Sequence, residues 1–506
     1  MPIWRGTTST DWNTASNWVI DGSGNTGVPT STTDAIFDSL SVNPCVMGAS
    51  RNCRDLTFTA FPSTLTVATF NLNVFRNIVF QANQSSRIIG TTGTLVCNAN
   101  SSITSNLGTW PLNYSIANVT NITMTLVDDM RVAGSYTVSG GVRIFNGNIL
   151  YIGGNVTSSS IHGGTTNLVM NGSGTYSTSG GQLWNLEVNT TGSIIITGTV
   201  TFTRRFIITA AGSITMTAAN VGITDTTTVN LGGRTIGNLT HNFNAGSQIV
   251  TYLTDVVCGN FTIGNGTNTY NGPGKIFAFG NYTVSAGAGI GSLVVELKGT
   301  GTISTGIMYL VTILNSSGIY TLGASLQISN NFTCQTLTLN AATSTVTVTS
   351  GVILNTLGIN WYNITIPTGA TITINQLLSI SNNLTLSGTN TFAGTAGWTC
   401  ANLLCSTISS VIILQNSVTY TTTTSVNMLA TAASPITMRS NTPTVTRAIW
   451  TLNHTATQSI VYVNGQGVDS NAGQTVWTFG GVITTALVPL NWNVGAKPYS
   501  YGFIGI

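Results

Sequence analysis

The chain has 506 residues, of which 42% are hydrophobic and only 5% are charged, and its formal net charge at pH 7 is +3. The hydrophobic fraction excludes a disordered chain, because it is large enough to build a core. The small net charge provides neither a basic surface for nucleic acid nor a polybasic membrane anchor. No apolar run has the length of a membrane span, so we expect no nucleic-acid partner and no membrane span.

Residues 1–44 differ in composition from the rest of the chain. They contain Trp4, Trp12 and Trp18, together with Pro29 and Pro44. We interpret this segment as an N-terminal cap that covers the open edge of the first turn of the following fold. Its first residues lack the basic and apolar stretches of a secretory signal, so we expect either a processed chain or delivery by another route.

Two patterns in this cap resemble ligand sites. The segment from Gly22 to Gly27 matches the phosphate-binding pattern G-x-G-x-x-G, but no helix follows, so we predict a glycine-rich turn. Four aspartates could offer oxygen ligands to a calcium ion, but their spacing fits no known ligand loop, so we predict neither metal nor cofactor. These aspartates are Asp11, Asp21, Asp34 and Asp38.

Residues 45–407 consist of short runs in which β-branched and polar residues alternate, as at residues 345–349, separated by glycine and asparagine. Such alternation predicts β-strands. An asparagine–apolar–threonine element recurs within these residues, and several successive copies stand 20 to 22 residues apart. Its clearest copies begin at Asn238, Asn260, Asn281, Asn331, Asn363 and Asn383, and weaker ones at Asn121 and Asn155.

A recurrence of this length predicts that the strands stack as the coils of a solenoid, in which neighbouring coils bury each other's apolar edges. We therefore predict an all-β chain that forms a single-stranded parallel β-helix, with three short strands per coil and about 18 coils between residues 45 and 410. The recurrent asparagine suits an internal amide ladder or a left-handed corner. A string of β-sandwich domains is the alternative, but the recurrence and the absence of linkers favour the solenoid.

Residues 408–506 lose the repeated element and contain longer apolar runs, with Trp450, Trp477 and Trp492. We interpret this segment as closing coils followed by a β cap or a small sandwich. The predicted organisation is therefore a cap over residues 1–44, a solenoid over residues 45–407 and a closing region over residues 408–506.

Both ends of the chain carry motifs of a known group of proteins. The first reads W-R-G, D-W, N-W and V-P between residues 4 and 29, and the second reads I-T-M-R-S at 436–440, D-S-N-A-G at 469–473 and N-W at 491–492. The chain thereby resembles the β-helical surface proteins of phage virions and of bacteria. The resemblance implies an extracellular or virion-surface β-helix used for display, adhesion or attachment, and it transfers no catalytic residue. Cell-surface members of this group usually carry an export signal and an anchor, and we recognise neither in this sequence. We therefore expect the chain to be closer to the virion members.

Acidic residues are scarce in the solenoid region, whereas glycoside hydrolysis needs two carboxylates about 5–10 Å apart. Asp128 and Asp129 are adjacent on a predicted strand edge, so they would point to opposite faces. Glu187 and Asp255 are the residues to test in a glycan-degrading protein, but the sequence does not pair either with another acid. We therefore predict no catalytic site. The acids between residues 56 and 407 are Asp128, Asp129, Glu187, Asp225, Asp255 and Glu296.

We predict structural roles, and no catalytic or metal-binding role, for the histidines and the paired arginines. The three histidines are isolated, so we predict no metal site. Of the paired arginines, one of Arg204 and Arg205 must face outward, and we expect such pairs to bridge coils or subunits. The histidines are His162, His241 and His454, and the other arginine pairs are Arg51 with Arg54 and Arg439 with Arg447.

The seven cysteines are too few for a disulfide scaffold in a chain of this length. We predict that most of them are small buried apolar residues. Local bridges between Cys45 and Cys53 and between Cys400 and Cys405 remain open, although neither pair has C-x-x-C spacing.

These features favour a non-enzymatic, elongated component of a virion surface: a fibre, spike or decoration protein for display or host attachment. The expected partners are other virion proteins, further copies of the chain and a host-surface glycan, with a homotrimer as one hypothesis. A cellular surface adhesin or filament subunit, located outside the cell or on its surface, is the first alternative. A glycan-degrading tailspike is the second.

Overall fold

The structure is a computed structural model. It describes residues 1–21, 23–82, 84–90, 92–106, 108–110, 112–116, 122–139, 142–158, 167–209, 213–242, 248–264, 268–285, 293–305, 307–308, 311–313, 319–323, 326–328, 332–334, 338–341, 343–349, 351–356, 359–470, 473–482 and 491–495.

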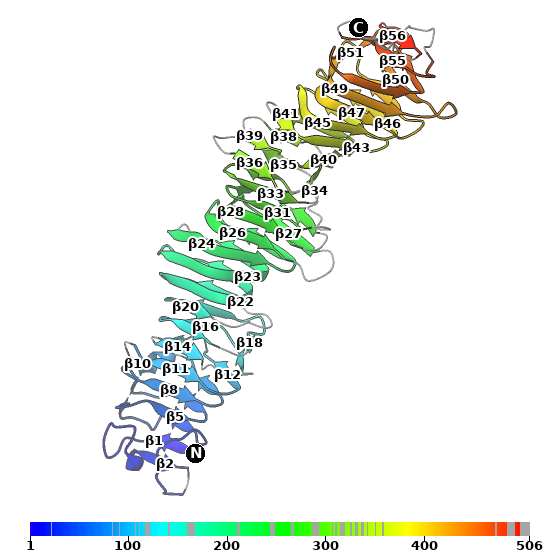
Figure 1. Ribbon diagram of the computed structural model, residues 1–506. Helices are drawn as coiled ribbons and strands as arrows, with labels where there is room; N and C mark the ends of the chain where they lie inside the picture. The colour runs from blue at the N-terminus through cyan, green and yellow to red at the C-terminus, as the bar shows by residue number, and fades with distance from the viewer. Residues whose placement is uncertain are drawn as a thin grey trace, which may run out of the picture. The chain divides into compact units, whose positions relative to one another are not determined.

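The chain is 58% strand and forms a parallel β-solenoid of about 19 turns, which confirms the predicted fold. The described residues contain no α-helix, and their helical turns are the two 3₁₀ turns η1 (Ala15–Asn17) and η2 (Ser85–Arg87). Two compact units make up the chain: Met1–Gly259 with Asn271–Gly274, and Asn260–Tyr270 with Lys275–Ile506. Within each unit, strands of successive coils lie side by side (Figure 1).

In the first coils, each turn contributes one strand to each of three faces, so a strand pairs in parallel with the third strand after it. The first face consists of β1 (Pro2–Trp4), β2 (Trp18–Ile20), β3 (Ala35–Phe37), β6 (Leu56–Phe58), β9 (Ile78–Phe80), β12 (Ser101–Thr104), β15 (Thr123–Leu126) and β18 (Val142–Ile144). The second contains β4 (Cys45–Val46), β7 (Leu65–Thr66), β10 (Ile88–Ile89) and, in later coils, β13 (Thr109–Trp110), β16 (Met130–Val132), β19 (Ile149–Ile152) and β21 (Asn167–Met170). The third contains β5 (Arg51–Cys53), β8 (Asn71–Val74), β11 (Thr94–Cys97), β14 (Asn113–Ile116), β17 (Tyr136–Val138) and β20 (Val156–Ser158).

Longer strands follow, and the longest of them run along more than one face of a coil. The first half of β22 pairs with β20 and its second half with β21, and register shifts mark the bends. These strands are β22 (Gly174–Val188), β23 (Ile194–Ile208), β24 (Ile214–Ile223), β25 (Thr227–Asn230), β26 (Thr235–His241), β27 (Gln248–Tyr252) and β28 (Val256–Ile263).

The second unit repeats the parallel arrangement. Up to residue 386 its strands are β29 (Asn268–Asn271), β30 (Ile276–Ala278), β31 (Tyr282–Val284), β32 (Val295–Leu297), β33 (Gly301–Thr305), β34 (Ile307–Met308), β35 (Val311–Ile313), β36 (Ile319–Leu322), β37 (Leu326–Ile328), β38 (Phe332–Cys334), β39 (Thr338–Asn340), β40 (Thr345–Val348), β41 (Val352–Thr356), β42 (Asn360–Trp361), β43 (Asn363–Ile366), β44 (Thr371–Ile374) and β45 (Leu378–Leu386). The later ones are β46 (Thr389–Ala393), β47 (Trp398–Cys405), β48 (Val411–Leu414), β49 (Thr419–Leu429), β50 (Ile436–Ser440), β51 (Ala448–Leu452), β52 (Thr457–Val461), β53 (Val463–Gln466), β54 (Val468–Asp469), β55 (Val476–Thr478) and β56 (Trp492–Val494).

The alternation of apolar and polar residues places one side of each strand in the core. In β44, Ile372 and Ile374 are buried, whereas Thr371 and Thr373 are exposed or half-buried. Equivalent residues also stack from coil to coil: the rings of Phe37 and Phe58 are stacked with centroids 4.7 Å apart. The core is therefore a continuous column within each unit, built from one face of every strand.

The N-terminal segment covers the first coil. Strand β1 pairs with β2 in antiparallel fashion and with β3 in parallel. Trp4, Trp12 and Trp18 are fully buried, and the rings of all three lie within 6.4 Å (centroid to centroid) of Phe37 on β3. The parallel pairing therefore already includes β1 and β3, and β3 starts ten residues before residue 45.

At the C-terminal end the coils continue. Every strand pair that the structure describes between Val411 and Val494 is parallel, including β55 with β56. These residues therefore show closing coils.

The recurrent asparagine forms an amide ladder between coils. The backbone N–H of Asn281 donates to Asn260 Oδ1 at 2.7 Å, and Thr302 N–H donates to Asn281 Oδ1 at 2.8 Å. Asn383 N–H donates in the same way to Asn363 Oδ1 at 3.2 Å. These asparagines are exposed or half-buried rather than internal, and none of them has a positive φ. Their side chains satisfy backbone donors of the next coil, so the ladder stabilises the stacking of coils and not a left-handed corner. Two predicted copies, at Asn121 and Asn331, lie outside the described residues.

The aspartates of the cap are engaged singly. Asp34 accepts two hydrogen bonds from Arg54, and Asp38 accepts two from Arg5. Asp11 accepts from the backbone N–H of Asn13 at 3.0 Å. Asp11, Asp34 and Asp38 therefore each have a hydrogen-bond partner of their own.

The ion pair of Asp34 with Arg54 is repeated one coil later by Asp55 with Arg76. Burial raises the pKa of the Asp55 carboxyl, but hydrogen bonds and charge from Arg76 outweigh it and hold this pKa below its usual value. Two successive ion pairs thus join neighbouring coils near the N-terminus. Arg54 bridges two coils, as we expected for the paired arginines.

The cysteines behave as predicted. Cys45, Cys53, Cys97, Cys258, Cys400 and Cys405 are all buried, and none of them is in a disulfide, so neither local bridge forms. Burial raises the pKa of the Cys258 and Cys400 thiols to about 12, which keeps them protonated and unreactive. The side chain of Cys334 lies outside the described part of the chain.

A glycine corner brings the backbones of successive coils unusually close. A Cβ on Gly172 would lie 2.0 Å from the carbonyl oxygen of Gly153 in the preceding coil, and one on Gly174 would lie 2.5 Å from that of Gly154. Only glycine fits this corner without separating the coils.

Replacing Gly172 by alanine should therefore destabilise the first unit by about 3 kcal/mol, since overpacking here meets backbone atoms that cannot rotate away. Scanning calorimetry would measure this as a lower melting temperature. Gly48→Ala is the matched control, because a Cβ at Gly48 meets no atom within 4 Å. Equal melting temperatures for the two variants would contradict the steric reason.

Candidate functional site

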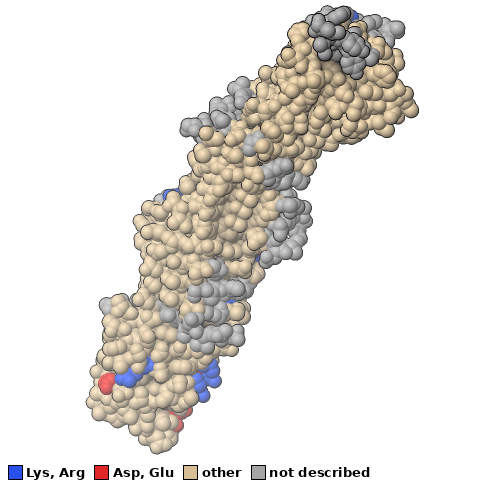
Figure 2. Space-filling view, in the orientation of Figure 1, with Lys and Arg blue, Asp and Glu red and all other residues tan. Residues whose placement is uncertain are grey.

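Charged side chains are unevenly distributed. On the face shown in Figure 2 they gather over the first coils, and few lie elsewhere. The sequence from residue 299 to residue 438 contains no aspartate, glutamate, lysine, arginine or histidine. Charged groups that lie together outside the cap are therefore the natural places to look for chemistry.

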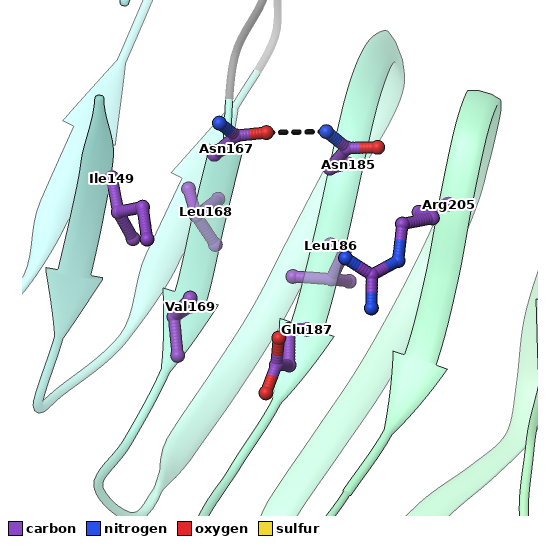
Figure 3. A pocket seen from close by; sticks show the side chains of 8 residues that line it. All are labelled: Ile149, Asn167, Leu168, Val169, Asn185, Leu186, Glu187 and Arg205. Atoms are coloured by element: carbon purple, nitrogen blue, oxygen red, sulfur yellow. Dashed lines mark hydrogen bonds between the residues drawn. The ribbon is translucent and has the colours of Figure 1, made fainter. Parts of the chain in front are cut away.

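One such place is a hollow on the outer face of β19, β21, β22 and β23. It has a volume of about 130 Å³ and is lined by Ile149, Asn167, Leu168, Val169, Asn185, Leu186, Glu187 and Arg205. Figure 3 shows these side chains on successive strands, with Arg205 reaching back over β22 toward Glu187.

The register of the coils explains this arrangement. Asn167 pairs with Asn185, which pairs with Arg205, so the three residues form one row across the coils. Val169 and Glu187 form the next row, two residues further along each strand. Because side chains alternate between the two sides of a strand, both rows lie on the outer side of the coils, where Val169 is nevertheless buried, while Leu168 and Leu186 point into the core.

A second, more open hollow of about 640 Å³ adjoins the first and shares Asn185 and Arg205 with it. Its other lining residues are Trp184, Arg204, Asp225, Thr226 and Thr228. The guanidinium of Arg204 lies over the Trp184 ring, 4.8 Å from its centroid. This cation–π contact joins neighbouring coils and orients Arg204.

A β-bulge makes both arginines available. Leu183 pairs with Phe202 and Asn185 with Arg205, so β23 has one extra residue at this point. Arg204 and Arg205 are consequently both exposed, whereas regular alternation would turn only one of them outward.

The charges in the first hollow are not paired with each other. Thr209 Oγ1 donates to Glu187 Oε1 at 3.1 Å. Within the described part of the chain, Arg205 has no ion pair and no hydrogen-bond partner, although Glu187 lines the same hollow. The side-chain oxygen of Asn185 is buried and likewise accepts no hydrogen bond, while its amide donates to Asn167. The hollow thus offers a cationic fork of donors, an unused acceptor and a carboxylate.

The other acids of the solenoid have structural roles. Asp128 Oδ1 accepts from Ser105 N–H at 2.7 Å, and Asp129 Oδ1 accepts from Ile149 N–H at the same distance. Glu296 is buried and pairs with Lys275 at 2.9 Å and with Lys298 at 3.3 Å. These carboxylates therefore neutralise local donors and cations. Asp255 lines neither hollow.

The two histidines that the structure describes, His241 and His454, lie in different environments. His241 is fully buried, where its Nε2 shares a hydrogen bond with the Tyr252 hydroxyl, and His454 is exposed. His162 lies outside the described residues. Among the residues that the structure describes, no three His, Cys, Asp or Glu side chains come together as metal ligands. In the G-x-G-x-x-G segment, Gly24 has a φ of +65°, as in a turn.

No helix in the described ranges combines the length and apolar character needed to cross a membrane.

Sequence reasoning selected Glu187 and the Arg204–Arg205 pair, but it missed Asn167, Asn185 and Trp184. Asn185 stands 18 residues after Asn167, close to the repeat length, and this spacing is the signal that could have placed them together. The hollow itself depends on the bulge in β23, which alternation alone does not reveal.

Comparison of the chain with family models, with curated proteins and with solved structures finds no match.

Proposed function

We propose that the chain is a non-enzymatic structural component of a virion surface: a fibre, spike or decoration protein that serves display or host attachment. The observation that carries this proposal is the parallel β-solenoid. Its backbone hydrogen bonds run from coil to coil, so it stays folded while presenting repeated outward rows of residues. The terminal motifs, which resemble those of β-helical surface proteins of virions, support the same proposal.

The outer surface is suited to attachment. Thr, Ser and Asn dominate the outward positions of strands such as β44 and β49, where they offer hydroxyl and amide groups to glycans or to a neighbouring subunit. Low charge also limits the dependence of such contacts on salt. A homotrimer remains part of the proposal, because surface spikes commonly follow the symmetry of their attachment point.

Electron microscopy of native particles, labelled with an antibody against this chain, tests the proposal. We expect label on capsids or tails, and its position would distinguish decoration from attachment. Antibody absorbed beforehand with the purified chain serves as the control. Label along cell envelopes or free filaments would overturn the virion assignment and favour the adhesin or filament subunit.

One observation favours a second candidate, a glycan-degrading tailspike: Glu187 and Asp225 line adjoining hollows. Release of reducing sugar ends from a host polysaccharide, lost in Glu187→Gln, would establish it. An unchanged polysaccharide would favour binding without cleavage.

A further inference from the structure

We propose that the two adjoining hollows bind a glycan through one carboxylated sugar residue, whose carboxylate is held by Arg205. This inference rests on the proposed attachment function, because it names the chemical class of the ligand at that surface.

The first step concerns Arg205. Its guanidinium is exposed, permanently charged and without an ion pair or hydrogen bond in the described part of the chain. A planar fork of donors matches the two oxygens of a carboxylate better than any single hydroxyl. Figure 3 shows the Arg205 side chain extending from β23 toward β22, so that its guanidinium lies beside the other lining residues.

The second step concerns the neighbouring acceptors. The buried Asn185 Oδ1 lacks a donor, and Figure 3 shows this oxygen turned toward β23. Buried acceptors normally receive a hydrogen bond, so a ligand hydroxyl would complete this one. Glu187, which receives one hydrogen bond from Thr209, can accept a second hydroxyl. A sugar acid supplies a carboxylate and several hydroxyls in one small ring.

The same residues disfavour other anions. A phosphate or sulfate group brings more negative charge and no row of hydroxyl donors, and it would lie beside the Glu187 carboxylate. Nucleic acid would meet the same repulsion, with only Arg204 and Arg205 to neutralise it. A carboxylate flanked by hydroxyls satisfies both the fork and the acceptors.

The third step concerns size. A hollow of about 130 Å³ is smaller than a site for a whole ligand, so it suits a single ring. The open hollow of about 640 Å³ continues from it past Trp184, whose ring and the Arg204 resting on it provide a flat surface for further sugar units. Because the first hollow is small and the second is open, we expect a dissociation constant of about 0.1–1 mM for a single chain.

Titration of the purified full chain with trigalacturonate or sialyllactose, followed by saturation-transfer NMR, tests the inference, and lactose and maltotriose serve as neutral probes. We expect saturation transfer to the two carboxylated probes only, weakening as salt is raised. Arg205→Gln should reduce their affinity at least tenfold, and Arg205→Lys severalfold, because lysine keeps the charge but not the fork. Arg131→Gln is the matched control, since Arg131 is exposed like Arg205 but lines neither hollow.

Equal binding of neutral and carboxylated probes, no binding of any probe, or full affinity in Arg205→Gln would each overturn the inference. None of these results bears on where the chain sits in a particle, which the antibody label decides separately. Conversely, label on cell envelopes combined with carboxylate-selective binding would overturn the virion assignment and support the glycan site.

Discussion

Replacing Trp18 by alanine is expected to lower the free energy of unfolding of the first unit by about 3–5 kcal/mol, the usual cost of deleting a buried tryptophan. Trp18 is fully buried, and its ring centroid lies 4.7 Å from that of Trp12 and 5.6 Å from that of Phe37. Its Nε1–H also donates to the Trp12 carbonyl oxygen at 2.8 Å, so the substitution removes packing and a buried hydrogen bond together.

The location of Trp18 in the N-terminal cap predicts which part of the chain unfolds first in the Trp18→Ala variant. The cap covers the open edge of β3, and an uncovered strand edge pairs readily with other chains. Because each coil contacts only its neighbours, unfolding should begin at the first coils and leave the second unit intact. Denaturant titration followed by circular dichroism, together with limited proteolysis, would show earlier cleavage near the N-terminus and self-association by light scattering.

Trp184→Ala is the control, because Trp184 lies in the same unit but faces outward and is only half-buried. It should change the stability far less than Trp18→Ala. Similar losses in the two variants would mean that the tryptophan cluster does not act as a cap.

The fold could be predicted from the sequence because every coil must bury one face of each strand and stack on the next coil. Alternation at residues such as Ile372 and Ile374 reports one buried face, and the recurrent asparagine reports the step from one coil to the next. Both patterns can be read along the sequence alone, without knowing which coils lie next to each other. The amide ladder was one of two roles that the pattern allowed, and only the register decided between them.

The candidate site was harder to predict from the sequence, because its residues come together only when successive coils stack. Glu187 and Arg205 are 18 residues apart, yet they line one hollow since each coil returns the chain to the same face. Both Arg204 and Arg205 face outward because β23 has one extra residue at this point, whereas alternation alone predicts that only one of them does. The division into two compact units after Gly259 has no counterpart in composition, so the sequence carries no signal for it.

The scarcity of charge also has a consequence for stability in acid. Few carboxylates change their protonation on folding, so the dependence of stability on pH should be dominated by the few groups whose pKa is shifted. One histidine is the clearest of these. His241 is fully buried, and burial lowers its pKa from 6.5 to about 3.

The free energy of unfolding of the first unit is therefore expected to fall as the pH is lowered from 6.5. Between pH 6.5 and 3 the unfolded chain binds a proton at His241 that the folded chain excludes, so the unfolded state is favoured by about 1.4 kcal/mol per pH unit. Over the whole window this amounts to about 4–5 kcal/mol. Above pH 6.5 the residue is neutral in both states and contributes no slope.

His241→Gln should abolish most of this slope, because the amide can still share a hydrogen bond with the Tyr252 hydroxyl but does not titrate. Denaturant unfolding at pH 7, 6, 5 and 4.5 would measure it. This range lies above the pH window of Asp38 and Asp55, whose lowered pKa values make stability fall only as the pH drops through and below about 3.8. His454→Gln is the control, since His454 is exposed and should leave the slope unchanged. If wild type and His241→Gln lose stability in parallel between pH 6.5 and 4.5, His241 is protonated in the folded chain, and its burial beside Tyr252 does not exclude the proton.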